Sequence, residues 1–316
     1  MELGGLHHVT AVTGDAAGNV AFYTQVLGLR LVKKTVNQDD VTAYHLFYGD
    51  ELGHPGTEVT FFDWPRIGPA LRGTQTIALI ALRVPDAAAL RWWARRFEQL
   101  GIAYRQEREL DDRPALAFAD PEGQALRLVA DARGVASTPW RRSPVPPEVA
   151  IRGLHAVTLC VADATPTADF LRDVLGFRQI GSYPFPDNAA RAVQVWAVGA
   201  GGSGAEVHLE ERPELPPGRV GIGGVHHVAL RAPDAAQQQA WRERIRRAGL
   251  AVTPVIDRYY FRSIYFHVPG QVLFEIATDG PGFAADEDPE HLGERLALPP
   301  FLEPRRAEIE RGLRPL

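Results

Sequence analysis

Cysteine and long apolar segments are nearly absent from this sequence. The chain has 316 residues and one cysteine, Cys160, which excludes an internal disulfide and a zinc site built from several thiolates. No apolar run approaches the ~20 residues that a membrane-spanning helix needs, and the N-terminal MELGG lacks the basic and apolar regions of a signal peptide. We therefore expect a cytoplasmic protein with no membrane partner, in which Cys160 is a small buried residue.

A strong excess of charge is also missing. The formal net charge is −5 at pH 7, which gives no electrostatic basis for binding nucleic acid or an anionic membrane. The length is that of about two domains of ~150 residues. A small molecule is therefore the expected partner, and a homo-oligomer is compatible with the composition.

What the sequence does contain is an internal repeat. A segment beginning GLHHVTAV at Gly5 is similar to one beginning GLHAVTLC at Gly153, and ALRVPDAAAL at Ala81 is similar to ALRAPDAAQQ at Ala229. The separation is 148 residues in both cases. The chain therefore consists of two homologous halves, each containing two similar modules.

Each module predicts a strand, a helix and three further strands. In the second module, apolar residues at spacings of three and four mark one helical face: Leu90, Trp93, Phe97 and Leu100. Asp86 is a suitable N-cap for this helix, and Gly101 is a suitable residue to end it. The expected fold class is α+β, with four βαβββ modules.

The modules define the expected domain organisation. Two modules occupy residues 4–131 and two occupy 151–279. Residues 132–150 are rich in proline and arginine and are expected to form an exposed linker. Residues 280–316 leave the repeat and are expected to form a tail of short helical pieces that wraps the body.

Comparison between modules singles out two histidines. With the offset of 148 residues, His8 corresponds to Ala156 and His227 to Leu79. Since the sister modules place apolar residues there, the fold does not require histidine at these positions. The two histidines therefore indicate a functional site.

A carboxylate in the last strand of the fourth module stands out in the same way. When GQVLFEIATD at 270–279 is aligned with GQALRLVADA at 123–132, Glu275 corresponds to Leu128. The same frame places Leu209 in the third module. This alignment predicts that a carboxylate replaces an apolar residue in the fourth module alone.

His8, His227 and Glu275 match the 2-His-1-carboxylate triad of non-haem Fe(II) proteins, which leaves metal positions open for substrate and dioxygen. Mn(II) also suits these ligands, and ligand type alone does not exclude Zn(II). Because the ligands come from the first and fourth modules, those modules must form one cup-shaped cavity. The second and third modules would form another.

Other histidines carry weaker signals. We interpret His45 as a strand surface residue in preference to a cavity residue, and His54 as a loop residue. The sequence offers no partner for four more: His155, His208, His267 and His291.

The modules resemble the vicinal oxygen chelate superfamily, also called the glyoxalase/bleomycin-resistance/extradiol dioxygenase fold. The resemblance covers about residues 5–279 and implies two tandem glyoxalase-like domains with cup-shaped, barrel-like sheets. Five segments are similar to a branch of ring-cleaving dioxygenases acting on hydroquinones: GLHHVT, GVHHVAL, DRYYFRSIYF, FEIATDGPGF and the tail. The resemblance implies that His8, His227 and Glu275 bind the metal.

The resemblance also implies which residues surround the metal. Five are expected: Tyr265, Arg258 and His226 as catalytic residues, and Thr10 and His7 as substrate-binding residues. Strand alternation, however, points His7 and His226 away from the face that carries the ligands. A twist or a β-bulge would have to bring them near the metal.

We therefore expect a ring-cleaving dioxygenase of the extradiol type that opens a hydroquinone or catechol with O₂, using Fe(II) or, as second choice, Mn(II). Arg258 would stabilise negative charge, and Tyr265 would donate a proton. One alternative is a glyoxalase-like lyase or isomerase, which usually needs a second carboxylate ligand. Glu58 and Glu206 are the nearest candidates for it, but both lie early in their strands. The other alternative is a non-catalytic protein that sequesters an aromatic ligand, which would not need open metal positions.

Overall fold

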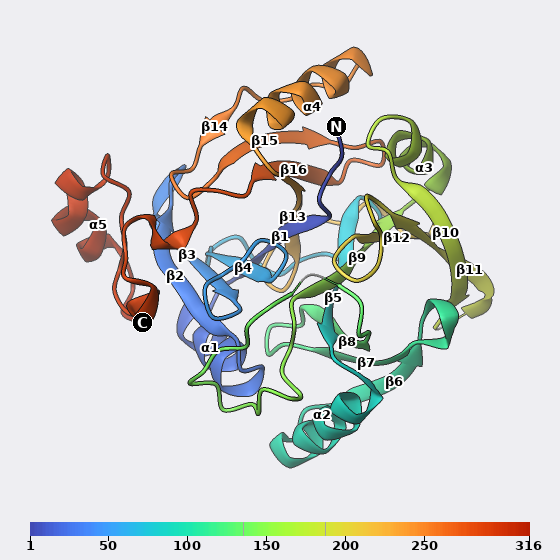
Figure 1. Ribbon diagram of the computed structural model, residues 1–316, viewed down its shortest axis with the longest axis horizontal. Helices are drawn as coiled ribbons and strands as arrows, with labels where there is room; N and C mark the ends of the chain where they lie inside the picture. The colour runs from blue at the N-terminus through green and yellow to red at the C-terminus, as the bar shows by residue number, and fades with distance from the viewer. Residues whose placement is uncertain (135, 187) are drawn as a thin grey trace.

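The computed structural model describes residues 1–134, 136–186 and 188–316. Two curled eight-stranded sheets lie side by side, with the longer helices on their outer surfaces (Figure 1). The prediction of an α+β fold is confirmed. Within the described ranges, no helix combines the length and the apolar character needed to cross a membrane.

The first sheet combines the first and fourth modules. Its strand order is β14-β15-β16-β13-β1-β4-β3-β2. The strands are β1 (Leu6–Thr13), β2 (Arg30–Asn37), β3 (Asp40–Gly49), β4 (Glu58–Asp63), β13 (Val225–Ala232), β14 (Ile256–Asp257), β15 (Arg262–His267) and β16 (Leu273–Thr278). The prediction that the two ends of the repeat close one cup is confirmed.

The second sheet combines the second and third modules in the order β10-β11-β12-β9-β5-β8-β7-β6. The strands are β5 (Thr76–Val84), β6 (Tyr104–Arg108), β7 (Pro114–Ala119), β8 (Ala125–Ala130), β9 (Leu154–Val161), β10 (Arg178–Phe185), β11 (Asn188–Ala197) and β12 (Glu206–Glu211). Each sheet therefore draws one module from each half of the chain. Cys160 on β9 is buried, as expected, and burial raises its pKa to about 12.

One helix follows the first strand of each module. The helices are α1 (Ala16–Ala21), α2 (Ala87–Leu100), α3 (Ala164–Asp173) and α4 (Ala235–Arg247). In α2, the Asp86 side chain accepts from the backbone N–H of Ala89, and Gly101 ends the helix at a φ of 67°. The predicted apolar face is buried except for Leu100, the last helical residue, which is exposed.

The segment between the halves is less exposed than predicted. Residues 136–150 contain no helix or strand, but Val145 is only 2% exposed. The hydroxyl of Ser143 donates to the carbonyl of Gly28, and the indole N–H of Trp93 donates to the carbonyl of Val149. The segment therefore packs against both modules of the first half.

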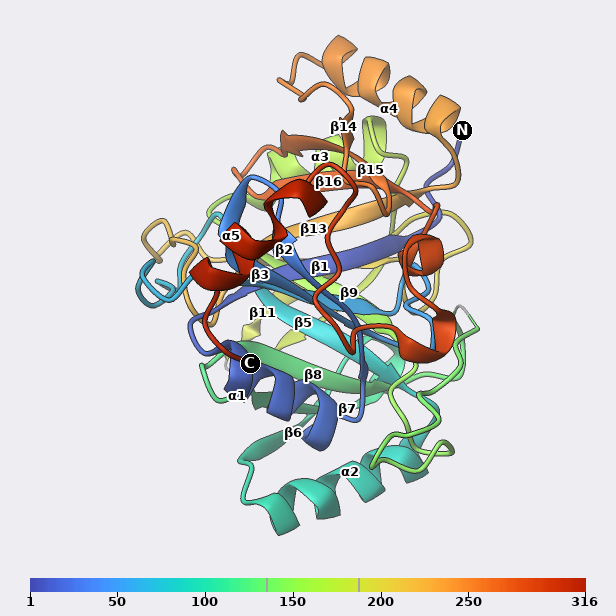
Figure 2. The ribbon, with the colours of Figure 1, turned by 90° about the vertical axis from the view of Figure 1, so that its left-hand side faces the viewer.

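The tail wraps the first module, as predicted, and Figure 2 shows it crossing β2 and β3. It contains η3 (Phe283–Ala285), η4 (Pro289–His291), η5 (Glu303–Arg305) and α5 (Arg306–Gly312). Two contacts hold it. Leu298, Leu302 and Ile309 form an apolar cluster with Val36, and the buried ammonium group of Lys33 pairs with Asp286 and Glu287.

Candidate metal centre

The three predicted ligands meet at the centre of the first sheet. The antiparallel pairing of β1 with β13 places His8 opposite Ala229 and His227 opposite Thr10, and the two Nε2 atoms are 3.4 Å apart. Glu275 on β16 pairs with Ala229. Its Oε2 lies 3.4 Å from His8 Nε2 and 2.9 Å from His227 Nε2. All three side chains are buried.

The neighbouring His7 determines the tautomer of His8. His7 Nε2 lies 3.2 Å from the carbonyl oxygen of Thr278, which can only accept, so Nε2 carries the proton. Burial lowers the pKa of His7 to about 3, so the ring is neutral and its Nδ1 is an acceptor. His8 Nδ1, 2.9 Å away, therefore donates to His7. In the neutral form of the His8 ring the lone pair is then on Nε2, the atom that points at Glu275.

A β-bulge brings the first histidine of each pair into this position. The register of β1 and β13 shifts at His7 and again at His226, so each is an extra residue in its strand. His226 Nδ1 lies 2.7 Å from His227 Nδ1, as in the first pair. Both histidines therefore contact a predicted ligand despite the strand alternation.

The convergence of these groups fits a divalent metal ion. Ser263 donates to Glu275 Oε1 over 2.5 Å, whereas Glu275 Oε2 is buried without a hydrogen-bond partner among the described residues. Neutral imidazoles protonated at Nδ1 cannot donate to it from Nε2. A cation would satisfy all three atoms. Their separations of 2.9 to 3.4 Å suit ligands bound at about 2.1 Å to one ion.

A cavity of about 40 Å³ opens above the predicted ligands. Its walls come from the first and fourth modules and include the rings of Phe47, Phe62 and Phe261. The Phe261 ring also contacts His8, with the two centroids 5.2 Å apart. The walls are therefore largely aromatic around a polar floor.

Arg258 and Tyr265 line this cavity, as expected for residues acting near the metal. The Arg258 guanidinium lies 5.7 Å from the centroid of the Tyr265 ring. Burial raises the pKa of the Tyr265 phenol. The phenol is therefore protonated at neutral pH and can donate a hydrogen bond or a proton.

Three other predicted residues lie behind the cavity wall. His7 and Thr10 are buried, and Thr10 Oγ1 is 2.8 Å from Thr60 Oγ1. His226 is half-buried and packs edge-on against Phe62. None of the three lines the cavity. The structure therefore does not support substrate contact by His7 and Thr10 or direct catalysis by His226.

His45 is a cavity residue, and its interpretation as a strand surface residue is wrong. It is half-buried, lines the cavity, and its Nε2 lies 3.0 Å from Thr60 Oγ1. β3 is covered on both faces, so its near-continuous apolar sequence carries no alternation that would have revealed the cavity side. On the first module's side, the cavity wall includes His45, Phe47 and Phe62.

Comparison with known proteins identifies the family. Residues 5–128 and 153–290 match the model of the Glyoxalase/Bleomycin resistance protein/Dioxygenase superfamily. The chain belongs to this superfamily.

Relatives within the superfamily match nearly the whole chain. "Putative ring-cleaving dioxygenase MhqA" of Bacillus subtilis is 47% identical, with both chains fully covered. "Chlorohydroquinone/hydroquinone 1,2-dioxygenase" of Sphingobium indicum is 33% identical, with 98% of this chain and 95% of the relative covered. The crystal structure of a putative dioxygenase from Bacillus subtilis superposes with a TM-score of 0.91 at 40% identity, covering 100% and 98% of the two chains.

The second cup of this superfamily member shows that the sequence alignment at Glu275 is wrong by one residue. β16 pairs with β13 through Glu275 and Ala229, and β8 pairs with β5 through Arg127 and Ala81. Since Ala81 and Ala229 are equivalent, the counterpart of Glu275 is Arg127 and not Leu128. The same shift replaces Leu209 by its neighbour His208 in the third module.

The position of Glu275 is therefore polar in every module. It is occupied by Thr60 in the first, Arg127 in the second and His208 in the third. The expectation that the second and third modules carry apolar residues, Leu128 and Leu209, at this position is wrong. The carboxylate, however, is still restricted to that module.

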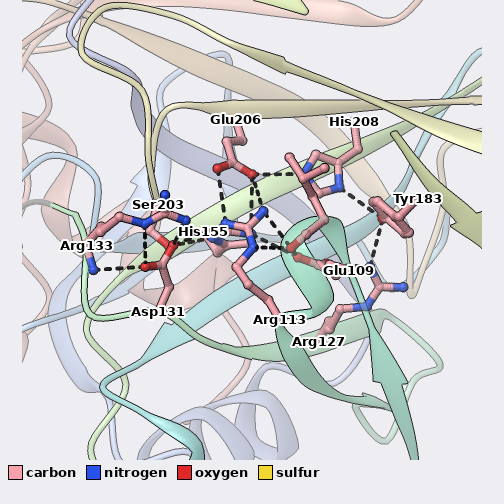
Figure 3. A network of polar contacts seen from close by, with 11 residues as sticks. Glu109, Arg113, Arg127, Asp131, Arg133, His155, Tyr183, Ser203, Glu206 and His208 are labelled. Carbon is pink, nitrogen blue, oxygen red and sulfur yellow. Dashed lines mark hydrogen bonds and ion pairs between the residues drawn. The ribbon is translucent and has the colours of Figure 1, made fainter. Parts of the chain in front are cut away.

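A buried polar network fills the floor of the second cup (Figure 3). Arg127 Nη1 lies 3.2 Å from the Tyr183 hydroxyl, which lies 3.1 Å from His208 Nδ1. His208 Nε2 is 3.2 Å from Glu206 Oε2, and Arg113 donates to both oxygens of Glu206, at 2.9 and 3.2 Å. Two guanidinium groups thus neutralise buried carboxylates.

This network includes two histidines for which the sequence offered no partner. Glu109, His155 and His208 lie close enough to hold a metal. Both oxygens of Glu109 are already engaged, however, by Arg127 Nη1 at 2.7 Å and by His155 Nε2 at 3.0 Å. The 148-residue offset from His7 to His155 was the sequence signal that could have predicted a second polar floor.

Proposed function

We propose that this chain is a metal-dependent ring-cleaving dioxygenase that opens a hydroquinone with O₂. The main support is the convergence of His8, His227 and Glu275 on one point at the floor of a cavity. Three ligands on one side of a metal leave other positions free for two reactants. The names of relatives that match nearly the whole chain indicate the same chemistry.

Fe(II) is the proposed metal. Two imidazoles and one carboxylate are the ligand set of non-haem Fe(II) oxygenases, and Mn(II) accepts the same nitrogen and oxygen ligands. When bound, the metal would lower the pKa of a substrate hydroxyl and carry electrons from the ring to O₂. His7 and His226 would keep the ligand imidazoles in the orientation that directs Nε2 toward the metal.

Arg258 and Tyr265 are the proposed catalytic residues of the cavity wall. The Arg258 guanidinium would stabilise negative charge that develops on a substrate oxygen. Tyr265, protonated at neutral pH, would donate a hydrogen bond and then a proton to an oxygen atom. The rings of Phe47, Phe62 and Phe261 would pack against the substrate ring and keep water away from it.

A hydroquinone substrate restricts the position of cleavage. Its two hydroxyls lie across the ring, so no bond joins two hydroxylated carbons. Cleavage must fall between a hydroxylated carbon and its neighbour, which is cleavage of the extradiol type. Both atoms of O₂ would enter the product, where the hydroxylated carbon becomes a carboxylic acid and an unsubstituted neighbour becomes an aldehyde.

The glyoxalase-like alternative is less well supported. A fourth ligand, related to Glu275 by the symmetry of the cup, would have to stand at Thr60. Its hydroxyl is already 2.8 Å from Thr10 and 3.0 Å from His45. Glu58, a candidate from the sequence, lies near His7 with its Oε2 4.0 Å from Nδ1. It therefore lies behind His8 and outside the ring of converging atoms.

Oxygen uptake tests this proposal. Protein loaded anaerobically with Fe(II) should consume one O₂ per hydroquinone and give a ring-opened acid, detected by mass spectrometry. H8A and H227A should each lose bound metal and oxygen uptake together. H267A, which changes an exposed histidine on β15, should retain both.

Two results would contradict the proposal. Tight binding of dihydroxybenzenes without oxygen uptake would identify a sequestering protein. Full metal occupancy in H8A or H227A would show that the ligand assignment is wrong.

A further inference from the structure

The cavity above the predicted ligands is too small for an aromatic ring. Its volume is about 40 Å³, whereas a cavity that accepts benzene measures about 150 Å³. The proposed substrate therefore cannot enter without movement of the wall. The wall segments that could move lie at the mouth.

Two segments from opposite ends of the chain meet at this mouth. One is the turn between β2 and β3, at residues 37–40, and the other begins at Arg258. The Asp39 carboxylate accepts two hydrogen bonds from the Arg258 guanidinium, at 2.8 and 3.1 Å. The Gln38 amide donates to the Arg258 carbonyl over 2.8 Å. Both contacts from the turn to the fourth module therefore end on Arg258.

The Arg258 side of the mouth is anchored by the tail. The Tyr260 hydroxyl donates to Asp286 over 2.9 Å, and the backbone N–H of Gly282 donates to the Tyr260 carbonyl over 2.8 Å. Among the described residues, the turn's other hydrogen bonds stay within the hairpin, where Asn37 accepts from the backbone N–H of Asp39 and Asp40 accepts from Thr42. Val36 and Val41, which flank the turn, pack against the tail. Movement is therefore confined to residues 37–40 at the tip of the hairpin.

The second cup differs from the first at the position of Arg258. Leu110 occupies this position in the second module, so the guanidinium that bonds to Asp39 has no counterpart there. The corresponding cavity, with Leu79 and Arg127 in its wall, has a volume of about 440 Å³. The cup that carries Arg258 at its mouth has the small cavity, and the cup that carries Leu110 at this position has the large one.

We propose that Asp39 is a positioning residue that acts through Arg258, closing the substrate mouth and releasing it when the turn swings outward. This inference rests on the proposed function, because the entering ligand is the aromatic substrate. The Asp39 side chain is 72% exposed and that of Arg258 17%. The pair is therefore accessible to salt and weak enough to open repeatedly. Once freed from Asp39, the guanidinium can face a substrate oxygen.

Access of a planar aromatic chelator to the metal tests this proposal. The full-length protein, D39N and D40N are loaded anaerobically with Fe(II) and mixed with 1,10-phenanthroline, whose iron complex is coloured. D39N should lose iron about two- to five-fold faster than the wild type, the effect expected for an exposed ion pair. Raising NaCl from about 20 mM to about 0.5 M should accelerate the wild type and leave D39N unchanged. D40N, which removes the adjacent charge, should match the wild type.

A substrate readout separates this inference from the proposed function. Stopped-flow binding of hydroquinone to the anaerobic Fe(II) protein should be faster in D39N by the same factor, and D39E should restore the wild-type rate. Equal chelation rates in the wild type, D39N and D40N would overturn the role of Asp39. Failure of the wild type to bind hydroquinone would instead overturn the proposed function, and the chelation rates would still decide the role of Asp39.

Discussion

The two cups share one scaffold and differ in how the charge at the floor is balanced. In the first cup, the Nε2 atoms of His8 and His227 and Oε2 of Glu275 converge on one point. In the second, the equivalent positions hold Ala156, Leu79 and Arg127. The guanidinium of Arg127 carries within the chain the positive charge that a metal would bring to the first cup.

The fold accommodates both arrangements of charge because the two cups have the same strand pairing and the same β-bulges. The pairing of β5 with β9 shifts register at Ala78 and His155, as the pairing of β1 with β13 does at His226 and His7. Each bulge turns one extra side chain toward the floor. The bulges are therefore a property of the fold, and the side chains they carry decide the chemistry.

The largest effect should come from removing the negative charge of Glu275. E275Q keeps the size of the side chain and an acceptor for Ser263 but weakens the metal site. We expect a loss of activity of about 10³-fold or more, since a metal contributes several kcal/mol to such reactions. Metal content and oxygen uptake measure it.

The same change in the second cup provides the comparison for E275Q. E206Q removes a buried carboxylate that bonds to Arg113 and His208. It should leave the activity of each folded molecule unchanged. An equal loss of activity in both variants would contradict the assignment of separate roles to the two cups.

A smaller effect should follow from breaking the network of the second cup. R113M removes the hydrogen bonds to Glu206 and the ion pair with Asp131, whose oxygen lies 3.1 Å from Nη1. The change leaves the buried Glu206 with histidine partners and without a guanidinium, and it should lower the free energy of unfolding by about 3–5 kcal/mol. Urea unfolding measures it. R172M, which removes exposed ion pairs with Asp169 and Asp173, should cost less than about 1 kcal/mol.

The repeat made much of this architecture predictable. A constant offset of 148 residues between Ala81 and Ala229 correctly indicated which modules share a cup and which histidines are unusual. Glu275 was chosen from a misaligned frame, yet its side chain lies beside those of His8 and His227. The match of Gly123-Gln124 with Gly270-Gln271 was misleading, because the left-handed turn position held by Gly123, at a φ of 88°, is held by Gln271 at 64°.

Other features could not be predicted because they depend on contacts between distant segments. The ion pair of Arg258 with Asp39 joins residues 219 positions apart, and neither residue suggests the other. The buried floor of the second cup likewise combines side chains from the second and third modules. His45 was missed because both faces of its strand are covered.

The smallest effect, and the most direct comparison of the two cups, concerns Glu58 and Glu206. Burial raises the pKa of Glu58 well above its usual range. Burial also acts to raise the pKa of Glu206, but hydrogen bonding to His208, together with His155 and Arg113, lowers it to about 2. A carboxyl group whose pKa is raised on folding destabilises the protein above pH 4.5, the pKa of the unfolded chain. A carboxyl group whose pKa is lowered on folding stabilises the protein above pH 4.5, and this contribution is lost as the pH falls to about 2.

At pH 7, E58Q should therefore stabilise the metal-free protein and E206Q should destabilise it. Between pH 4.5 and about 2, Glu206 alone should make the wild-type unfolding free energy fall by up to about 1.4 kcal/mol per pH unit. E206Q should flatten that slope, and E58Q should leave it unchanged. Urea titrations of the three proteins at several pH values measure these slopes. If E58Q and E206Q change the free energy of unfolding in the same direction at pH 7, Arg113 does not determine the charge state of the second cup's floor.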